Sequence, residues 1–227
     1  VRVKMRTTLK ALGLGLLLAM LGGCVTQTPY DYTAFKQSKP RSILVMPPVN
    51  TSPDIQAGYS MLSHVTLPLS EAGYYVLPVA VVDETFKQNG VMSADEAQAI
   101  PTAKLHEIFG ADAALYLEIT EYGASYQLIA SEVAVTAKAK LVDLRDGRLL
   151  WDGSARASSA ENQNNNGGGL IGLLVTAAIE QIMNSLTDRS HQIAGITSAR
   201  LLTGGMPNGI LRGPRSPQYA ENDKPVQ

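Results

Sequence analysis

The chain has 227 residues, a formal net charge of -1 at pH 7 and 45% hydrophobic residues, which suits one globular domain with extensions. The near-neutral charge offers no basic face for nucleic acid, and the single cysteine excludes an internal disulfide framework and a thiolate-rich zinc site. We therefore expect a folded core that binds no nucleic acid, metal or cofactor.

The N-terminus has the features of a secretory signal peptide. Four basic side chains come first, and an uncharged apolar run from Ala11 to Gly23 follows them. That run is shorter than the roughly 20 residues needed to cross a bilayer, but it has the length of a signal-peptide apolar region. Residues 1–23 are therefore predicted to be removed from the mature protein.

The only cysteine follows this run directly. Leu21, Gly22, Gly23 and Cys24 resemble the bacterial lipobox, in which the cysteine thiol is lipidated, the signal is cut before it and the new amino terminus is acylated, commonly with palmitate. Several acyl chains on one residue anchor a protein stably. The alternative is ordinary secretory cleavage beside an unrelated free cysteine. Val25 in place of aspartate favours the outer membrane over inner-membrane retention.

Composition divides the mature chain into three parts. Residues 24–40 are polar and are predicted to be a lipidated tether, residues 41–203 a single globular domain, and residues 204–227 an extended C-terminal tail. The domain begins with a predicted buried strand over Ser42–Val49, which stops at Pro47-Pro48.

A helix is predicted next, because Ser52-Pro53-Asp54 is a typical helix start. Pro68 should kink this helix or end its regular part, and Gly73 should end it. Its apolar face is predicted from helical spacing of five side chains, namely Ile55, Tyr59, Leu62, Val65 and Leu69.

A second strand is predicted over Tyr74–Val82, interrupted by Pro78. Short helices are expected over Asp83–Asn89, from Ser93 onward and over Pro101–Phe109.

Three strands follow, over Ala113–Tyr122, Glu132–Leu144 and Arg148–Ser158. The second alternates apolar and polar residues, as a half-buried strand does. Asp146-Gly147 predicts a tight hairpin turn between the second and third of these strands.

Residues Asn162–Gly169 have the composition of a flexible loop. A helix is predicted over Leu170–Leu186, packed either in the core or against a membrane or partner, and another over Ile193–Leu202. The order of elements indicates a mixed α/β (α+β-like) domain, in which helices pack on a largely antiparallel sheet.

No catalytic constellation is recognisable. The three histidines have no metal-ligand spacing, the glycine-rich stretch lacks the lysine of a phosphate-binding loop, and no Gly-x-Ser-x-Gly motif occurs. We therefore predict that the protein is not an enzyme. Tyrosines and an extended tail are typical of recognition surfaces, although the tail could equally be disordered. The candidate partner-binding residues are Tyr74, Tyr75, Ile210, Leu211, Arg212 and Arg215.

Two stretches resemble the GNA1162-like lipoprotein family, a family of unknown function: PLSEAGYYVLPVAVVDETFKQNG (Pro68–Gly90) and GGMPNGILRGPRSPQY (Gly204–Tyr219). That family is similar in fold to the periplasmic domain of curli-secretion lipoproteins and to the amino-terminal domain of the Tol-Pal propeller protein. Those relatives share a hairpin pattern that here comprises Asp143, Gly147 and Trp151. The resemblance implies a role beside surface-export machinery and transfers no catalytic residue.

These observations predict an outer-membrane lipoprotein on the periplasmic face, acting as a non-catalytic structural or adaptor component of an envelope or surface-export complex. Its expected partners are the membrane, other envelope proteins or further copies of itself. Two alternatives are a regulator of a periplasmic cell-wall enzyme, which should have a long tether, and a lipoprotein that binds a small ligand or lipid in an apolar pocket.

Overall fold

The computed structural model describes residues 29–126, 131–161 and 186–223. Residues from Asp31 onward belong to one compact unit, separate from Val1–Tyr30. The predicted signal peptide, the lipobox with Cys24, the loop over 162–169 and nearly all of the helix predicted over 170–186 lie outside the described residues.

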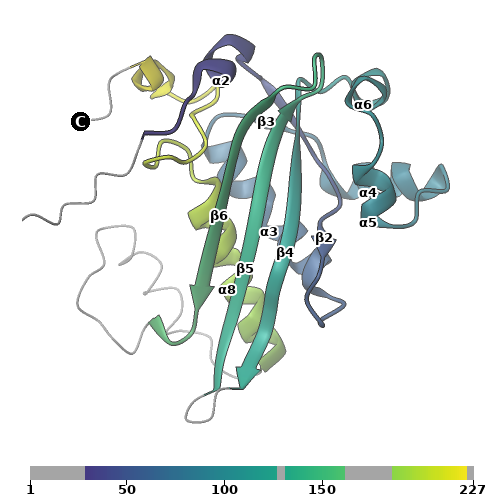
Figure 1. The fold of residues 1–227 in the computed structure, drawn as a ribbon, viewed down its shortest axis with the longest axis vertical. Coiled ribbons are helices and arrows are strands. Elements are labelled where there is room, and N and C mark those ends of the chain that lie inside the picture. Colours follow the sequence, from purple (N-terminus) through teal and green to yellow (C-terminus); the bar gives the residue numbers. More distant parts are fainter. Residues whose placement is uncertain (1–28, 127–130, 162–185, 224–227) are drawn as a thin grey trace, which may run out of the picture. The chain divides into compact units, whose positions relative to one another are not determined.

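A mixed sheet is the framework of the unit (Figure 1). Its strand order is β3-β1-β4-β5-β6, and β2 pairs with β4 beyond the end of β1. The three short strands β1 (Ser42–Val45), β2 (Val49–Asn50) and β3 (Tyr75–Val76) form parallel pairs. The long strands β4 (Ala113–Tyr126), β5 (Ser131–Asp143) and β6 (Leu149–Ser158) are antiparallel and supply most of the sheet's pairings.

Helices pack on both faces of this sheet. Helices α3 (Ala57–Glu71) and α8 (Leu186–Leu202) contact each other and the strands on one face. Helices α4 (Val79–Gln88), α5 (Ala94–Gln98) and α6 (Thr102–Phe109) share a core cluster with Leu44 and Met46 of β1 and its extension. Alternate residues of a strand face opposite sides, so α4–α6 lie across β1 from the α3 side. The predicted mixed, largely antiparallel sheet packed with helices is confirmed.

Several predicted elements are confirmed with shifted ends. The first strand stops before Pro47-Pro48, and the chain re-enters the sheet as β2. Helix α3 passes through Pro68 and ends in a Schellman motif, in which Tyr74 N–H donates to Leu69 O and Gly73 N–H donates to Ser70 O. The Asp146-Gly147 hairpin is present, but its loop spans residues 144–148, and Gly147 N–H donates to Asp143 O at 2.9 Å.

Two predictions of local structure were wrong. The strand predicted over Tyr74–Val82 is limited to β3, because Pro78 caps α4 and residues from Val79 onward are helical. Part of the predicted tether is folded: α2 (Thr33–Ser38) buries Phe35 at 3% exposure against the domain. A single aromatic residue in a polar segment forms no periodic pattern, so the sequence did not predict this helix.

The C-terminal tail also packs on the domain (Figure 1). Ile210 is completely buried, and three side chains donate hydrogen bonds to tail carbonyls. Tyr32 donates to Gly209 O, Trp151 Nε1 to Asn208 O at 3.0 Å, and Tyr74 to Leu211 O at 2.6 Å. A short 3-10 helix, η2 (Tyr219–Asp223), follows. The tail is therefore part of the folded unit over its described length.

Candidate functional site

The predicted partner-binding residues divide into buried and exposed groups. Tyr74 and Ile210 are 4% and 0% exposed, so they hold the tail in place and are not available to a partner. This corrects their assignment. Burial beside Leu211 raises the pKa of the Tyr74 phenol well above its usual range, which keeps it a neutral donor.

The other members lie nearer the surface. Tyr75 is 51% exposed, and the Arg215 guanidinium carbon lies 5.7 Å from its ring centroid, a cation–π distance. Arg212 forms an ion pair with Glu221 at 3.1 Å, and Leu211 is half-buried. Of the six residues, Tyr75 and Arg215 therefore form the most accessible pair.

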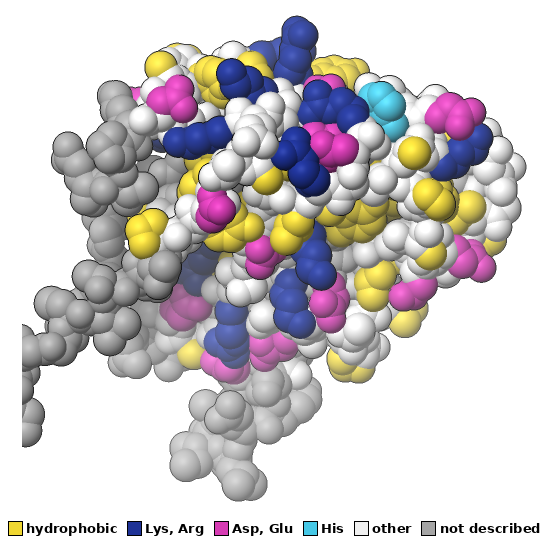
Figure 2. Space-filling model, turned by 45° about the horizontal axis from the view of Figure 1, so that its top comes forward, with side chains coloured by type: hydrophobic (Ala, Val, Ile, Leu, Met, Phe, Trp, Pro, Cys, Tyr) yellow, Lys and Arg dark blue, Asp and Glu magenta, His cyan; other side chains and the backbone are white. Residues whose placement is uncertain are grey.

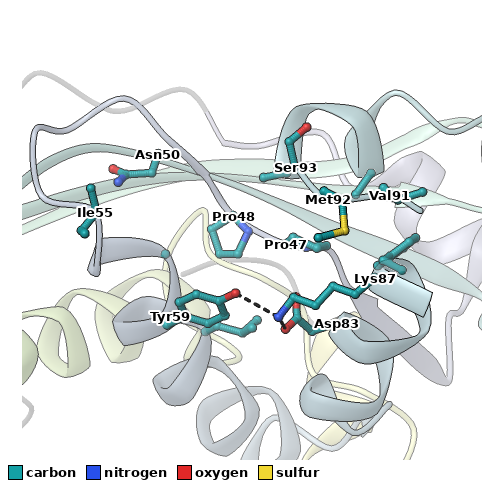
Figure 3. A pocket seen from close by; sticks show the side chains of 15 residues that line it. Pro47, Pro48, Asn50, Ile55, Tyr59, Asp83, Lys87, Val91, Met92 and Ser93 are labelled. Atoms are coloured by element: carbon teal, nitrogen blue, oxygen red, sulfur yellow. Dashed lines mark hydrogen bonds and ion pairs between the residues drawn. The ribbon is translucent and has the colours of Figure 1, made fainter. Parts of the chain in front are cut away.

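An apolar groove that the sequence did not predict lies between β2, α3, α4 and α5 (Figure 3). Its volume is about 180 Å³. Pro47 and Pro48 line it from the chain between β1 and β2. Three apolar side chains on its border reach into solvent, and they are Ile55, Tyr59 and Met92, with exposed fractions of 89%, 61% and 73%.

Local hydrogen bonds fix the walls of this groove. The Gln98 side-chain amide donates to Pro47 O at 2.8 Å and to Leu117 O at 3.1 Å, tying α5 to the sheet. Ser93 and Glu96 form a capping box at the start of α5, and the Glu96 carboxylate accepts the Met92 N–H at 3.1 Å. The backbone that carries Met92 is therefore held in position.

Lys87 is the one cation lining the groove. Its Nζ donates to Asp83 Oδ2 at 2.6 Å and to Tyr59 OH at 3.1 Å (Figure 3). The hydrogen bond to Asp83, with a smaller effect from Tyr59, raises the pKa of Lys87 above its usual value. A lysine that stays protonated cannot act as a base or nucleophile, so this group is suited to binding.

A second polar cluster joins α3 to α8 and β4. Ser60 Oγ lies 2.8 Å from His191 Nδ1 and accepts a hydrogen bond from Tyr122 OH at 2.7 Å. The rings of His64 and His191 have centroids 4.2 Å apart. Burial, and then the charge of His191, lower the pKa of His64. The sequence could not reveal this cluster, since its members come from three distant segments.

This serine–histidine pair lacks the rest of a hydrolytic site. Within the described ranges, no carboxylate forms an ion pair with His191, and the Ser60 N–H donates to Gln56 O inside the helical turn. Among the described residues, Asp54 lines the same hollow but is not paired with His191, and the Ser60 N–H is not free to stabilise an oxyanion. No group of three metal-ligating side chains occurs in the described part of the chain.

In the same part of the chain, no helix combines the length and apolar character needed to span a membrane.

Comparison with known proteins identifies the family. Residues 30–215 match the family model described as "Putative lipoprotein GNA1162-like". A curated relative named "Putative lipoprotein NMB1124/NMB1162", from Neisseria meningitidis serogroup B, is 53% identical over 205 residues, which are 90% of this chain and 94% of the relative.

One solved structure supports the same relationship. The crystal structure of lipoprotein GNA1162 from Neisseria meningitidis is 54% identical, with a TM-score of 0.51, and covers 64% of this chain and all of that chain. The PelC dodecamer from Paraburkholderia phytofirmans is 12% identical, with a TM-score of 0.44 over 78% of this chain and 93% of that chain, a likeness too weak to bear on function. The family model and the close relatives agree, and the chain belongs to the GNA1162-like lipoprotein family.

Proposed function

We propose that this protein is a lipid-anchored, non-catalytic adaptor that binds a protein of an envelope or surface-export complex. The observation that carries this proposal is the groove beside α5. Its border exposes Ile55, Tyr59 and Met92 around the groove, and exposed apolar surface rimmed by polar side chains is typical of protein-binding sites. We propose the groove as the partner-binding site in place of Tyr74 and Ile210, because both side chains are buried where the tail packs on the domain.

Anchoring is proposed through Cys24, with Leu21, Gly22 and Gly23 as the recognition sequence. Val25 supports the outer membrane as the destination, and the periplasmic face is the side on which an envelope complex would be reached. Because α2 begins at Thr33, only residues 25–32 separate it from the anchor. A chain of that length spans at most about 30 Å.

This short connection favours an adaptor over a regulator that reaches through the cell wall, which needs a long tether. At this site, the size of the groove favours a side chain of a partner protein over a small ligand. Its volume of about 180 Å³ lies below the roughly 300–1,000 Å³ usual for ligand pockets. An apolar side chain of a partner protein fits such a space better than a whole lipid or metabolite does.

In-cell crosslinking of the tagged protein tests the proposal. Ile55→Asp combined with Met92→Asp should abolish recovery of an export-complex partner without unfolding the domain, because substitutions at exposed sites change the free energy of unfolding by only about 0.5 kcal/mol. Ile108→Asp is the matched control, since Ile108 is 50% exposed on α6 and lies outside the groove. A Cys24→Ala variant should lose the anchor.

Two results would contradict the adaptor role. One is a protein that crosslinks to nothing but is correctly lipidated and folded. The other is a partner that is retained unchanged in the Ile55→Asp, Met92→Asp variant. Recovery of a cell-wall synthase would instead support the regulatory alternative.

A further inference from the structure

Basic side chains gather at the end of the domain where the chain arrives from Cys24. Helix α2 lies against the β5–β6 turn there, since Arg145 donates to Ser38 O and Arg148 to Gln37 Oε1, both at 2.9 Å. The tail adds to the same end through Arg215, whose Nη1 donates to Arg41 O at 3.3 Å. The cluster comprises Lys36, Lys39, Arg41, Arg145, Arg148, Arg212 and Arg215. Figure 2, in which the top of the domain comes forward, shows Lys and Arg side chains among acidic ones on this face.

Four of these seven cations are neutralised locally. Their ion pairs are Lys36–Asp223 at 3.9 Å, Arg145–Asp143 at 2.6 Å, Arg148–Asp146 at 2.7 Å and Arg212–Glu221 at 3.1 Å. Lys39, Arg41 and Arg215 are exposed, and in the described part of the chain they form no ion pair with a carboxylate. Three cations at this end thus remain available to an external anion.

A hollow between α2 and the tail lies within the same surface. Its volume is about 220 Å³, and Lys36, Lys39 and Arg212 line it together with the Tyr219 ring and the Asp223 carboxylate. Because Lys36 and Arg212 are paired with Asp223 and Glu221, Lys39 is the lining cation that gives the hollow its excess positive charge. A phosphate group can accept hydrogen bonds from lysine and arginine in such a space.

The position of this surface along the chain suggests what it contacts. Residues 25–32 are the whole connection from Cys24 to α2, at most about 30 Å when fully extended, so a lipidated Cys24 keeps this end of the domain beside the bilayer. We propose that the surface formed by α2, the β5–β6 turn and the tail docks onto the anionic phospholipid headgroups of the membrane that holds the anchor.

This contact would orient the domain and would not recruit it. Each cation close to an anionic bilayer increases the fraction of protein in contact with the membrane surface roughly five-fold relative to the unbound form. Lys39, Arg41 and Arg215 together therefore give an increase on the order of a hundred-fold. That is too little to hold a free domain on a membrane. For a tethered domain it is enough to favour one orientation. In Figure 1 α2 lies at the top of the sheet and β2 lower down, so the groove stays accessible.

The test attaches the protein to vesicles chemically. Its outcome therefore depends neither on the proposed adaptor role nor on lipidation of Cys24 in the cell. The mature chain from Cys24 onward has a single thiol, which can be coupled to a maleimide lipid in vesicles of phosphatidylcholine, with or without phosphatidylglycerol. Lysine acetylation followed by mass spectrometry then reports exposure. Lys36 and Lys39 should become at least about ten-fold less reactive on the anionic vesicles. Lys138 and Lys140, on the exposed face of β5, should stay reactive.

Charge reversal provides the second arm. Arg41→Glu combined with Arg215→Glu should remove the protection of Lys36 and Lys39, as should high salt, which screens exposed charges. The matched variant, Lys138→Glu with Lys140→Glu, should leave the protection unchanged, and the circular dichroism of both variants should match wild type. Equal labelling of Lys36 and Lys39 on the two kinds of vesicle, or protection of Lys138 and Lys140 instead, would overturn the proposal.

Discussion

At the scale of single residues, the hairpin pattern of Asp143, Gly147 and Trp151 connects α2 with the C-terminal tail. Asp143 is 1% exposed and accepts a hydrogen bond from Ser38 Oγ at 2.6 Å, which attaches α2. Gly147 has φ of 75° and completes the turn. Trp151 donates to Asn208 O and so attaches the tail. This hairpin pattern is therefore explained by structure and requires no catalytic role.

We expect Asp143→Asn to destabilise the protein at neutral pH and much less in acid. Burial raises the pKa of the Asp143 carboxyl, but hydrogen bonds from Arg145 and Ser38 outweigh burial and lower the pKa to about 2. The native state thus favours the ionised form. Its contribution is complete above the unfolded pKa of about 3.9 and disappears as pH falls toward the folded value. With allowance for solvent near Arg145, the loss at pH 7 should be about 1–2 kcal/mol.

Urea unfolding across this pH range measures the effect. Glu84→Gln is the control, because Glu84 is exposed on α4, and it should change little at any pH. A cost for Asp143→Asn that stayed constant down to the lowest pH would show that the ionised carboxylate is not the stabilising form.

The His64–His191 contact predicts a separate loss of stability in mild acid. Burial lowers the pKa of His64, as does the charge of His191, so below about pH 6.5 the unfolded chain binds more protons than the native state. Stability should therefore fall as pH drops below that value. His64→Gln should reduce the decrease in melting temperature between about pH 7 and pH 5. His106→Gln is the control. An undiminished decrease in His64→Gln would assign the acid sensitivity elsewhere.

At the scale of elements, the glycine that ends α3 has two roles. Gly73 has φ of 97°, and a Cβ there would lie 2.3 Å from Ser216 N and 2.8 Å from Gly213 O in the tail. We expect Gly73→Ala to cost about 3 kcal/mol or more, since it combines backbone strain with displacement of the tail. Gly90→Ala is a matched control, with φ of 81° and no atom within 4 Å, and should cost about 1 kcal/mol. Equal costs in urea unfolding would contradict a close approach of the tail.

Sequence patterns predicted the elements whose signals are local. The alternation in β5, the helix start at Ser93 and the glycine after α3 each depend on residues within a few positions of one another. The groove did not emerge in this way. Ile55 and Tyr59 fit the apolar spacing of α3, yet the helix begins only at Ala57, and the buried side of its first turn carries Ala57 and leaves Tyr59 exposed. Whether an amphipathic face is covered depends on tertiary packing, which periodicity does not encode.

The same limit applies to contacts between distant segments. His64 and His191 are separated by most of the domain, and each histidine alone carries no signal of the other. Helix α2 has one buried aromatic and no amphipathic repeat, so composition alone assigned it to a tether. The tail is rich in glycine and proline, which is typical of disorder. Its burial of Ile210 depends on a site built by the rest of the fold.

At the scale of the whole molecule, the tail closes the domain, and its removal should nearly unfold the protein. Burial of Ile210 contributes about 2–3 kcal/mol, and the hydrogen bonds from Tyr32, Trp151 and Tyr74 to tail carbonyls add about 1 kcal/mol each. Truncation before Gly204 should therefore cost about 5 kcal/mol, near the total stability of small domains. The emission of Trp151, the only tryptophan, should shift to the red as its environment becomes wet. Truncation after Asp223 should change neither quantity, and an unaltered melting temperature in the longer deletion would show that the tail is dispensable for folding.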